Sequence, residues 1–103
     1  MCSLNRILSY SLAINEALRQ SMSECLEVIL IGQGVTSPWY VGNTCLNLLR
    51  QFGDERVIDT PISENACTGI AVGASMVGLK PIVVFPRMDF MLYAMDSIIN
   101  EAA

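Results

Sequence analysis

The sequence contains no histidine, and this absence excludes several classes of functional site. Without an imidazole, the chain has no Ser-His-Asp triad, no histidine proton shuttle and few ways to bind zinc. Charge is also scarce, because charged residues make up 16% of the chain, against about 25% in typical soluble domains. The net charge of −4 and the lack of a basic run argue against nucleic acid or an anionic membrane as a partner.

Cysteine pairs and long apolar runs are missing as well. The cysteines form no C-x-x-C pair, which argues against a zinc or thioredoxin-like site, and we interpret them as reduced, mostly buried thiols. Residues 1–13 show no secretory signal, and the apolar runs 28–31 and 81–86 are too short to cross a bilayer. These features predict a cytoplasmic or organelle-matrix protein. The four cysteines are Cys2, Cys25, Cys45 and Cys67.

What the chain does contain is apolar residues in regular patterns. Hydrophobic residues make up 52% of the 103 positions, which predicts one folded domain rather than a disordered chain. The combination of high apolar content and low charge suggests that a partner or further sequence covers part of the surface.

Strand-like and helix-like segments alternate along the chain. The predicted strands cover residues 27–31, 56–59 and 81–85. The predicted helices cover residues 5–25 and 43–52, a segment capped by Ser63 that runs to about residue 77, and a segment capped by Asp89 that runs to residue 103. This order predicts an α/β fold with three layers, in which helices flank a mostly parallel sheet.

In such sheets ligands bind beyond the carboxyl ends of the strands, so three segments are candidates for a site. Gly32, Gln33 and Gly34 follow the first strand and resemble the start of a dinucleotide-binding loop, but the third glycine is missing and no helix begins at once, so the pattern favours a flexible turn. Glu64 follows the second strand, either as an acid that interacts with the helix dipole or as an acid that faces a pocket. Phe90 follows the third strand, either as a core residue or as a flat surface for a heterocycle.

The helix after Glu64 contains two glycines, Gly69 and Gly73. Each costs about 1 kcal/mol relative to alanine inside a helix, so we expect another backbone to approach closely there. The contact is either with the sheet of the same chain or with a second subunit.

Several motifs in fixed order resemble the beta subunit of thiamine diphosphate-dependent 2-oxo acid dehydrogenases, which include the pyruvate, branched-chain and acetoin enzymes. The motifs are ERVIDTPISE at 55–64, GIAVGA at 69–74, GLKP at 78–81 and the segment 88–103. The wider class is the transketolase-like pyrimidine-binding domain. The resemblance implies that residues 1–103 are the amino-terminal part of this domain and that the carboxyl-terminal transketolase domain is absent from the sequence.

The resemblance also implies a catalytic role for Glu64. In the family, the corresponding glutamate bonds a ring nitrogen of the cofactor's aminopyrimidine and promotes the tautomer that activates the thiazolium carbon. The activated cofactor decarboxylates a 2-oxo acid, and the acyl group (acetyl for pyruvate) passes to lipoamide. Phe90 matches the aromatic residue that packs on the pyrimidine, and Ile62 matches an aliphatic residue that lines it. Gln33 stands where the family has an acid that helps to order the site.

The implied partners are an alpha subunit, a second beta subunit and a lipoyl-bearing acyltransferase core. The alpha subunit of such a heterotetramer holds the magnesium and the diphosphate, so the site lies between chains, and we expect these 103 residues to be inactive alone. Two alternatives remain open. One is a non-catalytic interaction module of the same fold, with Gln33 marking lost chemistry. The other is an unrelated nucleotide-binding α/β protein.

Overall fold

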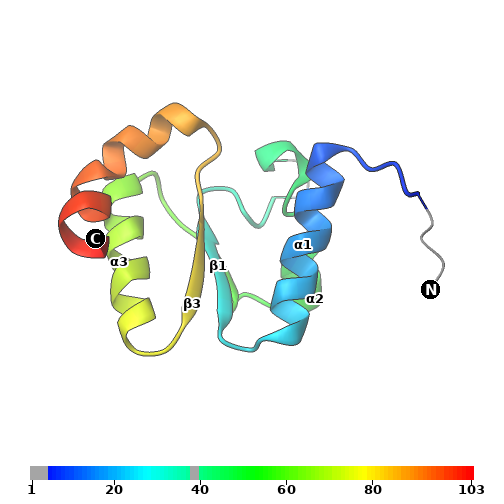
Figure 1. Ribbon diagram of the computed structural model, residues 1–103, viewed down its shortest axis with the longest axis horizontal. Coiled ribbons are helices and arrows are strands. Elements are labelled where there is room, and N and C mark those ends of the chain that lie inside the picture. The colour runs from blue at the N-terminus through cyan, green and yellow to red at the C-terminus, as the bar shows by residue number, and fades with distance from the viewer. Residues whose placement is uncertain (1–4, 38–39) are drawn as a thin grey trace.

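A three-stranded parallel sheet separates two layers of helices in the computed structural model, which describes residues 5–37 and 40–103 (Figure 1). The strand order is β2-β1-β3, with β1 at Val28–Gly32, β2 at Val57–Asp59 and β3 at Lys80–Val84. One face carries α1 (Tyr10–Glu24) and α2 (Leu48–Phe52), and the other carries α3 (Glu64–Met76), η2 (Met88–Ala94) and η3 (Ser97–Ala102). The predicted α/β fold class is confirmed.

The central strand β1 is buried along its whole length, as its uninterrupted apolar sequence predicts. Its residue Leu30 pairs with Val57 of β2 and Ile82 of β3 and packs in a core with Met22 and Leu48. The same register aligns the three carboxyl ends, because Gly32 pairs with both Asp59 and Val84. The segments that follow the three strands therefore begin side by side at one edge of the sheet.

Gly32 is the position where β1 and β3 approach most tightly. A Cβ atom there would lie 2.7 Å from the Val84 carbonyl oxygen and 3.1 Å from Val35 Cγ1. Separations below 3.0 Å are not tolerated between a Cβ and backbone, so a side chain would force the strand ends apart. The sequence requires glycine here because of this packing and not because of an unusual φ angle.

Arg56 connects the opposite, amino-terminal edge of the sheet to α1. Its guanidinium donates hydrogen bonds to the carbonyl oxygens of Met22, Cys25 and Val28 at 2.8 to 2.9 Å. It also lies over the Phe52 ring, 5.1 Å from the centroid. These contacts give hydrogen-bond donors to carbonyls at the end of α1 and the start of β1 and so connect the two elements.

Two predicted helices are shorter than expected. The first begins at Tyr10, where the Ser9 side chain accepts a hydrogen bond from Leu12 N–H, and residues 5–9 are exposed and outside it. The second, predicted over 43–52, reduces to α2 after the 3₁₀ turn η1 (Tyr40–Asn43). Left-handed backbone at Asn43 and Asn47 interrupts it, and the buried Asn15 amide of α1 holds this irregular segment by donating to the carbonyls of Thr44 and Leu46.

The prediction of one α-helix capped by Asp89 is wrong. The segment forms a 3₁₀ helix, η2, preceded by Arg87 at the cap position, and then a π-helix, η3. Ser97 bonds to α3 at this point, because its N–H donates to Asn65 Oδ1 and its hydroxyl donates to the Asn65 carbonyl. These tertiary bonds make the segment follow the surface of α3 rather than continue as a regular helix.

The two helical glycines have different surroundings. A Cβ at Gly69 would lie 3.1 Å from Glu101 Oε2 and 3.5 Å from Ser97 Oγ, so its neighbours are side chains of η3 in the same chain, and the expected approach of another backbone is wrong there. A Cβ at Gly73 would meet nothing within 4 Å, so the expected close contact is not made there within the described chain.

The thiols follow the expectation where the structure describes them. Cys25, Cys45 and Cys67 are free, and Cys45 and Cys67 are buried, while Cys2 lies outside the described residues. Burial raises the pKa of the Cys45 thiol, against a smaller opposing effect of its contact with Thr44. Across residues 5–37 and 40–103, no helix has the length and apolar character needed to cross a membrane.

We predict opposite effects of alanine at two glycines. Gly32→Ala should lower the free energy of unfolding by about 1–3 kcal/mol, because the new Cβ overpacks against the Val84 carbonyl. Gly73→Ala is the matched control and should raise it by up to about 1 kcal/mol, because the added methyl group meets open space and improves helix propensity. Urea denaturation measures both, and a Gly32→Ala variant as stable as the parent would contradict the close approach.

Candidate ligand-binding groove at the carboxyl edge of the sheet

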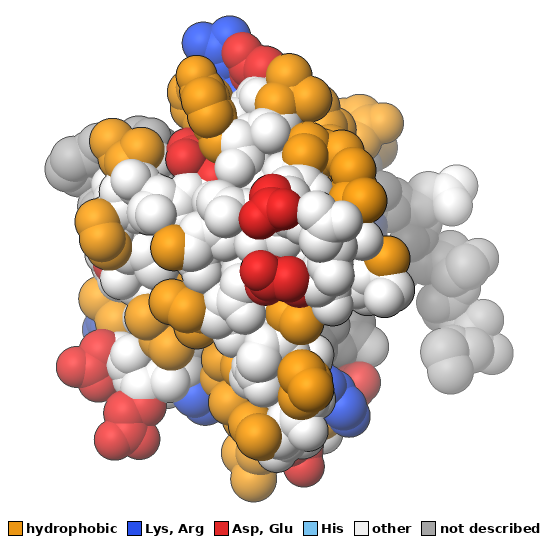
Figure 2. Space-filling model, turned by 90° about the vertical axis from the view of Figure 1, so that its left-hand side faces the viewer, with side chains coloured by type: hydrophobic (Ala, Val, Ile, Leu, Met, Phe, Trp, Pro, Cys, Tyr) orange, Lys and Arg blue, Asp and Glu red, His pale blue; other side chains and the backbone are white. Residues whose placement is uncertain are grey.

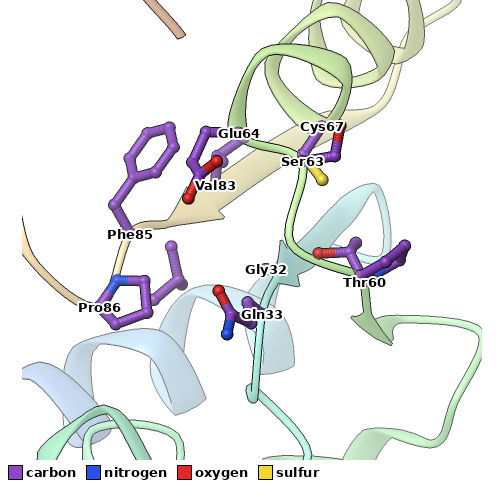
Figure 3. Close-up of a pocket in the computed structure, with 11 residues that line it drawn as sticks. Gly32, Gln33, Thr60, Ser63, Glu64, Cys67, Val83, Phe85 and Pro86 are labelled. Carbon is purple, nitrogen blue, oxygen red and sulfur yellow. The ribbon is translucent and has the colours of Figure 1, made fainter. Parts of the chain in front are cut away.

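A narrow pocket lies where the three strands end. Its walls come from the segments after all three strands and include Gln33, Thr60, Glu64 and Phe85 (Figure 3). In Figure 3 the Glu64 carboxylate extends from the start of α3 toward the side of the pocket where Phe85 and Pro86 lie, and the Gln33 amide lies at the end of β1. The enclosed space is about 10 Å³, which is room for roughly one water molecule.

A wider groove continues from this pocket and shares Gln33 and Glu64 with it. The groove has a volume of about 420 Å³. Its lining residues are Gln33, Ile62, Glu64, Phe90 and Tyr93. All four site residues expected from the sequence therefore meet here, although they come from three separate segments of the chain.

Glu64 satisfies both interpretations that the sequence left open. It is the first residue of α3, where the helix dipole favours a negative charge, and it also lines the groove. Ser63 precedes it at the cap position but makes no side-chain capping bond, so the predicted Ser63 cap is wrong. Glu64 is half-buried, and in Figure 3 its carboxyl group extends to the Phe85 side of the narrow pocket.

An aromatic wall faces Glu64 from η2. A 3₁₀ helix has three residues per turn, so Phe90 and Tyr93 lie on the same side of η2 and both line the groove. The Arg87 guanidinium lies 5.5 Å from the centroid of the Phe90 ring, a geometry in which the cation stabilises the ring position. Tyr93 was not among the site residues expected from the sequence, although its spacing of three from Phe90 is the spacing that aligns two residues in a 3₁₀ turn.

Asp59 fixes the loop that carries Gln33. Its carboxylate accepts hydrogen bonds from Gly34 N–H at 2.9 Å and from the Thr36 hydroxyl at 2.6 Å. Partial burial acts to raise the pKa of Asp59, but the bonds from Thr36, Gly34 and Thr60 outweigh it and lower the pKa. The loop continues as a turn through Thr36, so the segment Gly32 to Gly34 is not the glycine-rich start of a helix that a dinucleotide loop requires.

Comparison with known proteins gives one matching family and several similar proteins. Residues 7–103 match the family described as transketolase, pyrimidine binding domain. The chain is 39% identical over 97 residues to the 2-oxoisovalerate dehydrogenase subunit beta of Bacillus subtilis, covering 94% of this chain and 30% of that protein. It is 44% identical over 96 residues to the mitochondrial pyruvate dehydrogenase E1 component subunit beta of Rattus norvegicus, covering 89% of this chain and 27% of that protein.

A second bacterial relative has a similar level of identity to the chain. The pyruvate dehydrogenase E1 component subunit beta of Rickettsia bellii is 43% identical over 96 residues, covering 89% of this chain and 30% of that protein. The chain thus spans less than a third of the length of these curated relatives.

We predict that Asp59 makes stability depend on pH in the acid range. Its pKa is lowered by folding, so its contribution is complete above the ordinary aspartate value of about 3.9 and is lost as the pH falls through the lower folded pKa. Asp59→Asn should flatten the fall in unfolding free energy below about pH 4 and cost no more than about 1 kcal/mol at neutral pH, because Asp59 and its bonds are exposed to solvent. Denaturation at several pH values measures this, with Asp54→Asn, at an exposed turn position, as control. An unchanged pH profile in Asp59→Asn would contradict the assigned role of these bonds.

Proposed function

Because the chain belongs to the transketolase pyrimidine-binding domain family, we propose that it binds the aminopyrimidine of thiamine diphosphate as part of a 2-oxo acid dehydrogenase beta subunit. In this proposal residues 1–103 are the amino-terminal part of the pyrimidine-binding domain. The observation that carries the proposal is the convergence of Gln33, Ile62, Glu64 and Phe90 on one groove. An unrelated nucleotide-binding protein is set aside, because the family match covers residues 7–103.

The chemistry of the groove fits an aminopyrimidine. A flat heterocycle packs well against an aromatic ring, and Phe90 supplies one beside the aliphatic side chain of Ile62. The ring nitrogens and the amino group need polar partners, and Glu64 and Gln33 supply a carboxyl group and an amide in the same groove. The groove volume of about 420 Å³ leaves room for such a ring.

Glu64 has the catalytic role in this proposal. When bound, thiamine diphosphate supplies the nucleophilic carbon that adds to the carbonyl of a 2-oxo acid, releases carbon dioxide and transfers the acyl group to lipoamide. Glu64 holds a proton against the pyrimidine ring nitrogen, a task that suits a half-buried carboxyl group at a fixed position. Ile62 and Phe90 orient the ring, and Gln33 takes the place of an acid with a neutral amide.

The proposed partners are an alpha subunit, which would hold magnesium and the diphosphate, a second beta subunit and a lipoyl-bearing acyltransferase. Support comes from the apolar side chains that remain exposed on the face of α3, η2 and η3 (Figure 2). They include Ile70, Met76, Val77, Leu92 and Ile99. Exposed apolar groups at this density favour burial against another chain. The location we propose is the cytoplasm or an organelle matrix, and the rat relative is named as mitochondrial.

A non-catalytic interaction module is the second candidate function. Gln33 favours it, because an amide at this position carries no charge and the groove then holds a single carboxylate, Glu64. In this case the groove would keep its shape but not activate a cofactor.

We predict that Glu64→Gln abolishes cofactor activation and leaves the fold intact. The test uses the complete beta chain that carries this segment, assembled with an alpha subunit, and measures deuterium exchange at the thiazolium carbon together with turnover. We expect both rates to fall by about 10²- to 10⁴-fold, because a glutamine cannot share the proton with the ring nitrogen. Calorimetry measures whether thiamine diphosphate still binds.

Glu55→Gln is the matched control, because Glu55 is an exposed acid in the turn before β2, outside the groove. It should leave exchange and turnover unchanged. Normal turnover in Glu64→Gln would overturn the catalytic assignment. A parent complex that assembles but binds no thiamine diphosphate would favour the interaction module.

A further inference from the structure

Tyr93 is a groove residue that the family resemblance does not explain. It lies one 3₁₀ turn after Phe90, and the two rings form a ridge between the groove and a neighbouring hollow of about 390 Å³. The Tyr93 side chain projects from this ridge, with 71% of its surface exposed, whereas Phe90 is half-buried. The Phe90 ring therefore forms the base of the ridge, and the Tyr93 phenol forms its exposed rim.

The hydroxyl of Tyr93 has a capacity for hydrogen bonding that the described part of the chain does not use, since no residue there bonds to it. The other polar groups that line the groove are the Glu64 carboxylate and the Gln33 amide, and Gln33 already makes an interaction. Within this lining, Tyr93 is thus a neutral donor that is available to a ligand.

The carboxylate of Glu64 in the groove lining makes a neutral donor useful for an anionic substrate. A 2-oxo acid carries a carboxylate, and Glu64 repels that charge when it is ionised. A hydrogen bond from a neutral donor to a carboxylate is among the stronger ones, and it acts on the substrate without changing the charge beside Glu64. Gln33 also limits the repulsion of an anionic substrate, because an acid at that position would add a second negative charge to the groove.

We propose that Tyr93 is a substrate-positioning residue whose hydroxyl donates a hydrogen bond to the carboxylate of the 2-oxo acid. The inference rests on the proposed function and adds the residue that recognises the anionic end of the substrate. Phe90 and Tyr93 then have different roles on one wall of the groove. The Phe90 ring faces the aminopyrimidine, and the Tyr93 hydroxyl faces the substrate.

The test separates the hydroxyl from the ring in the assembled complex of the complete beta chain. Tyr93→Phe should raise KM for the 2-oxo acid about 10- to 100-fold and change kcat by less than about twofold. The inhibition constant of the uncharged 2-oxo amide with the same carbon chain should change much less, because its weaker acceptor depends less on the donor. Tyr10→Phe is the matched control, since Tyr10 is 91% exposed on α1, on the opposite face of the sheet, and it should alter neither constant.

An equilibrium measurement removes the dependence on turnover. The Kd of the 2-oxo acid for the Glu64→Gln complex, measured by calorimetry, should rise about tenfold or more when Tyr93→Phe is added. An unchanged KM and Kd in Tyr93→Phe would overturn the proposal. Equal increases for the acid and the amide would also overturn it, because they would indicate a general change in the groove. Normal turnover in Glu64→Gln would instead reject the proposed function, so the two failures are distinguishable.

Discussion

The close contact between the ends of β1 and β3 is the constraint on which the groove depends. Gly32 has no side chain, and only this allows the Val84 carbonyl to lie where a Cβ would be 2.7 Å away. The contact aligns the carboxyl ends of all three strands, because Gly32 also pairs with Asp59. Gln33, Glu64 and the segment leading to Phe90 then start from one edge. The groove is therefore a consequence of strand register before any groove side chain makes a contact.

Hydrogen bonds at the margin of the groove then fix the segments that leave this edge. Asp59 holds the loop that carries Gln33 through Gly34 and Thr36. Ser97, at the start of η3, bonds to Asn65 of α3 and so positions the preceding aromatic wall of η2 relative to Glu64. None of these four polar residues lines the wider groove. The groove residues can vary in chemistry while these bonds preserve its shape, which agrees with the amide of Gln33 at a position where the family resemblance implies an acid.

The sequence predicts what local patterns determine and misses what distant bonds determine. Apolar runs and alternation were sufficient to predict the three parallel strands, and the family resemblance named four residues, from three segments, that line one groove. The irregular segment before α2 was missed, because its conformation depends on the Asn15 amide, which is about thirty residues away. The 3₁₀ and π geometry of the last segment was missed for the same reason, since Ser97 bonds to Asn65. Tyr93 was not predicted as a groove residue for the same reason, because its alignment with Phe90 follows from the 3₁₀ turn.

The low charge of the chain is also found in the groove, where the lining holds a single carboxyl group. In the proposed function Glu64 shares a proton with a ring nitrogen, and such a carboxyl group works best with few other charges nearby. In the lining of this groove Glu64 is the single ionisable carboxyl group, and the other side chains are an amide, a phenol, an aromatic ring and an aliphatic chain. In the proposed function, this arrangement leaves the charge on an incoming 2-oxo acid to be met by neutral donors, by the helix dipole at the start of α3 and by groups beside the lining such as Arg87, which lies over Phe90.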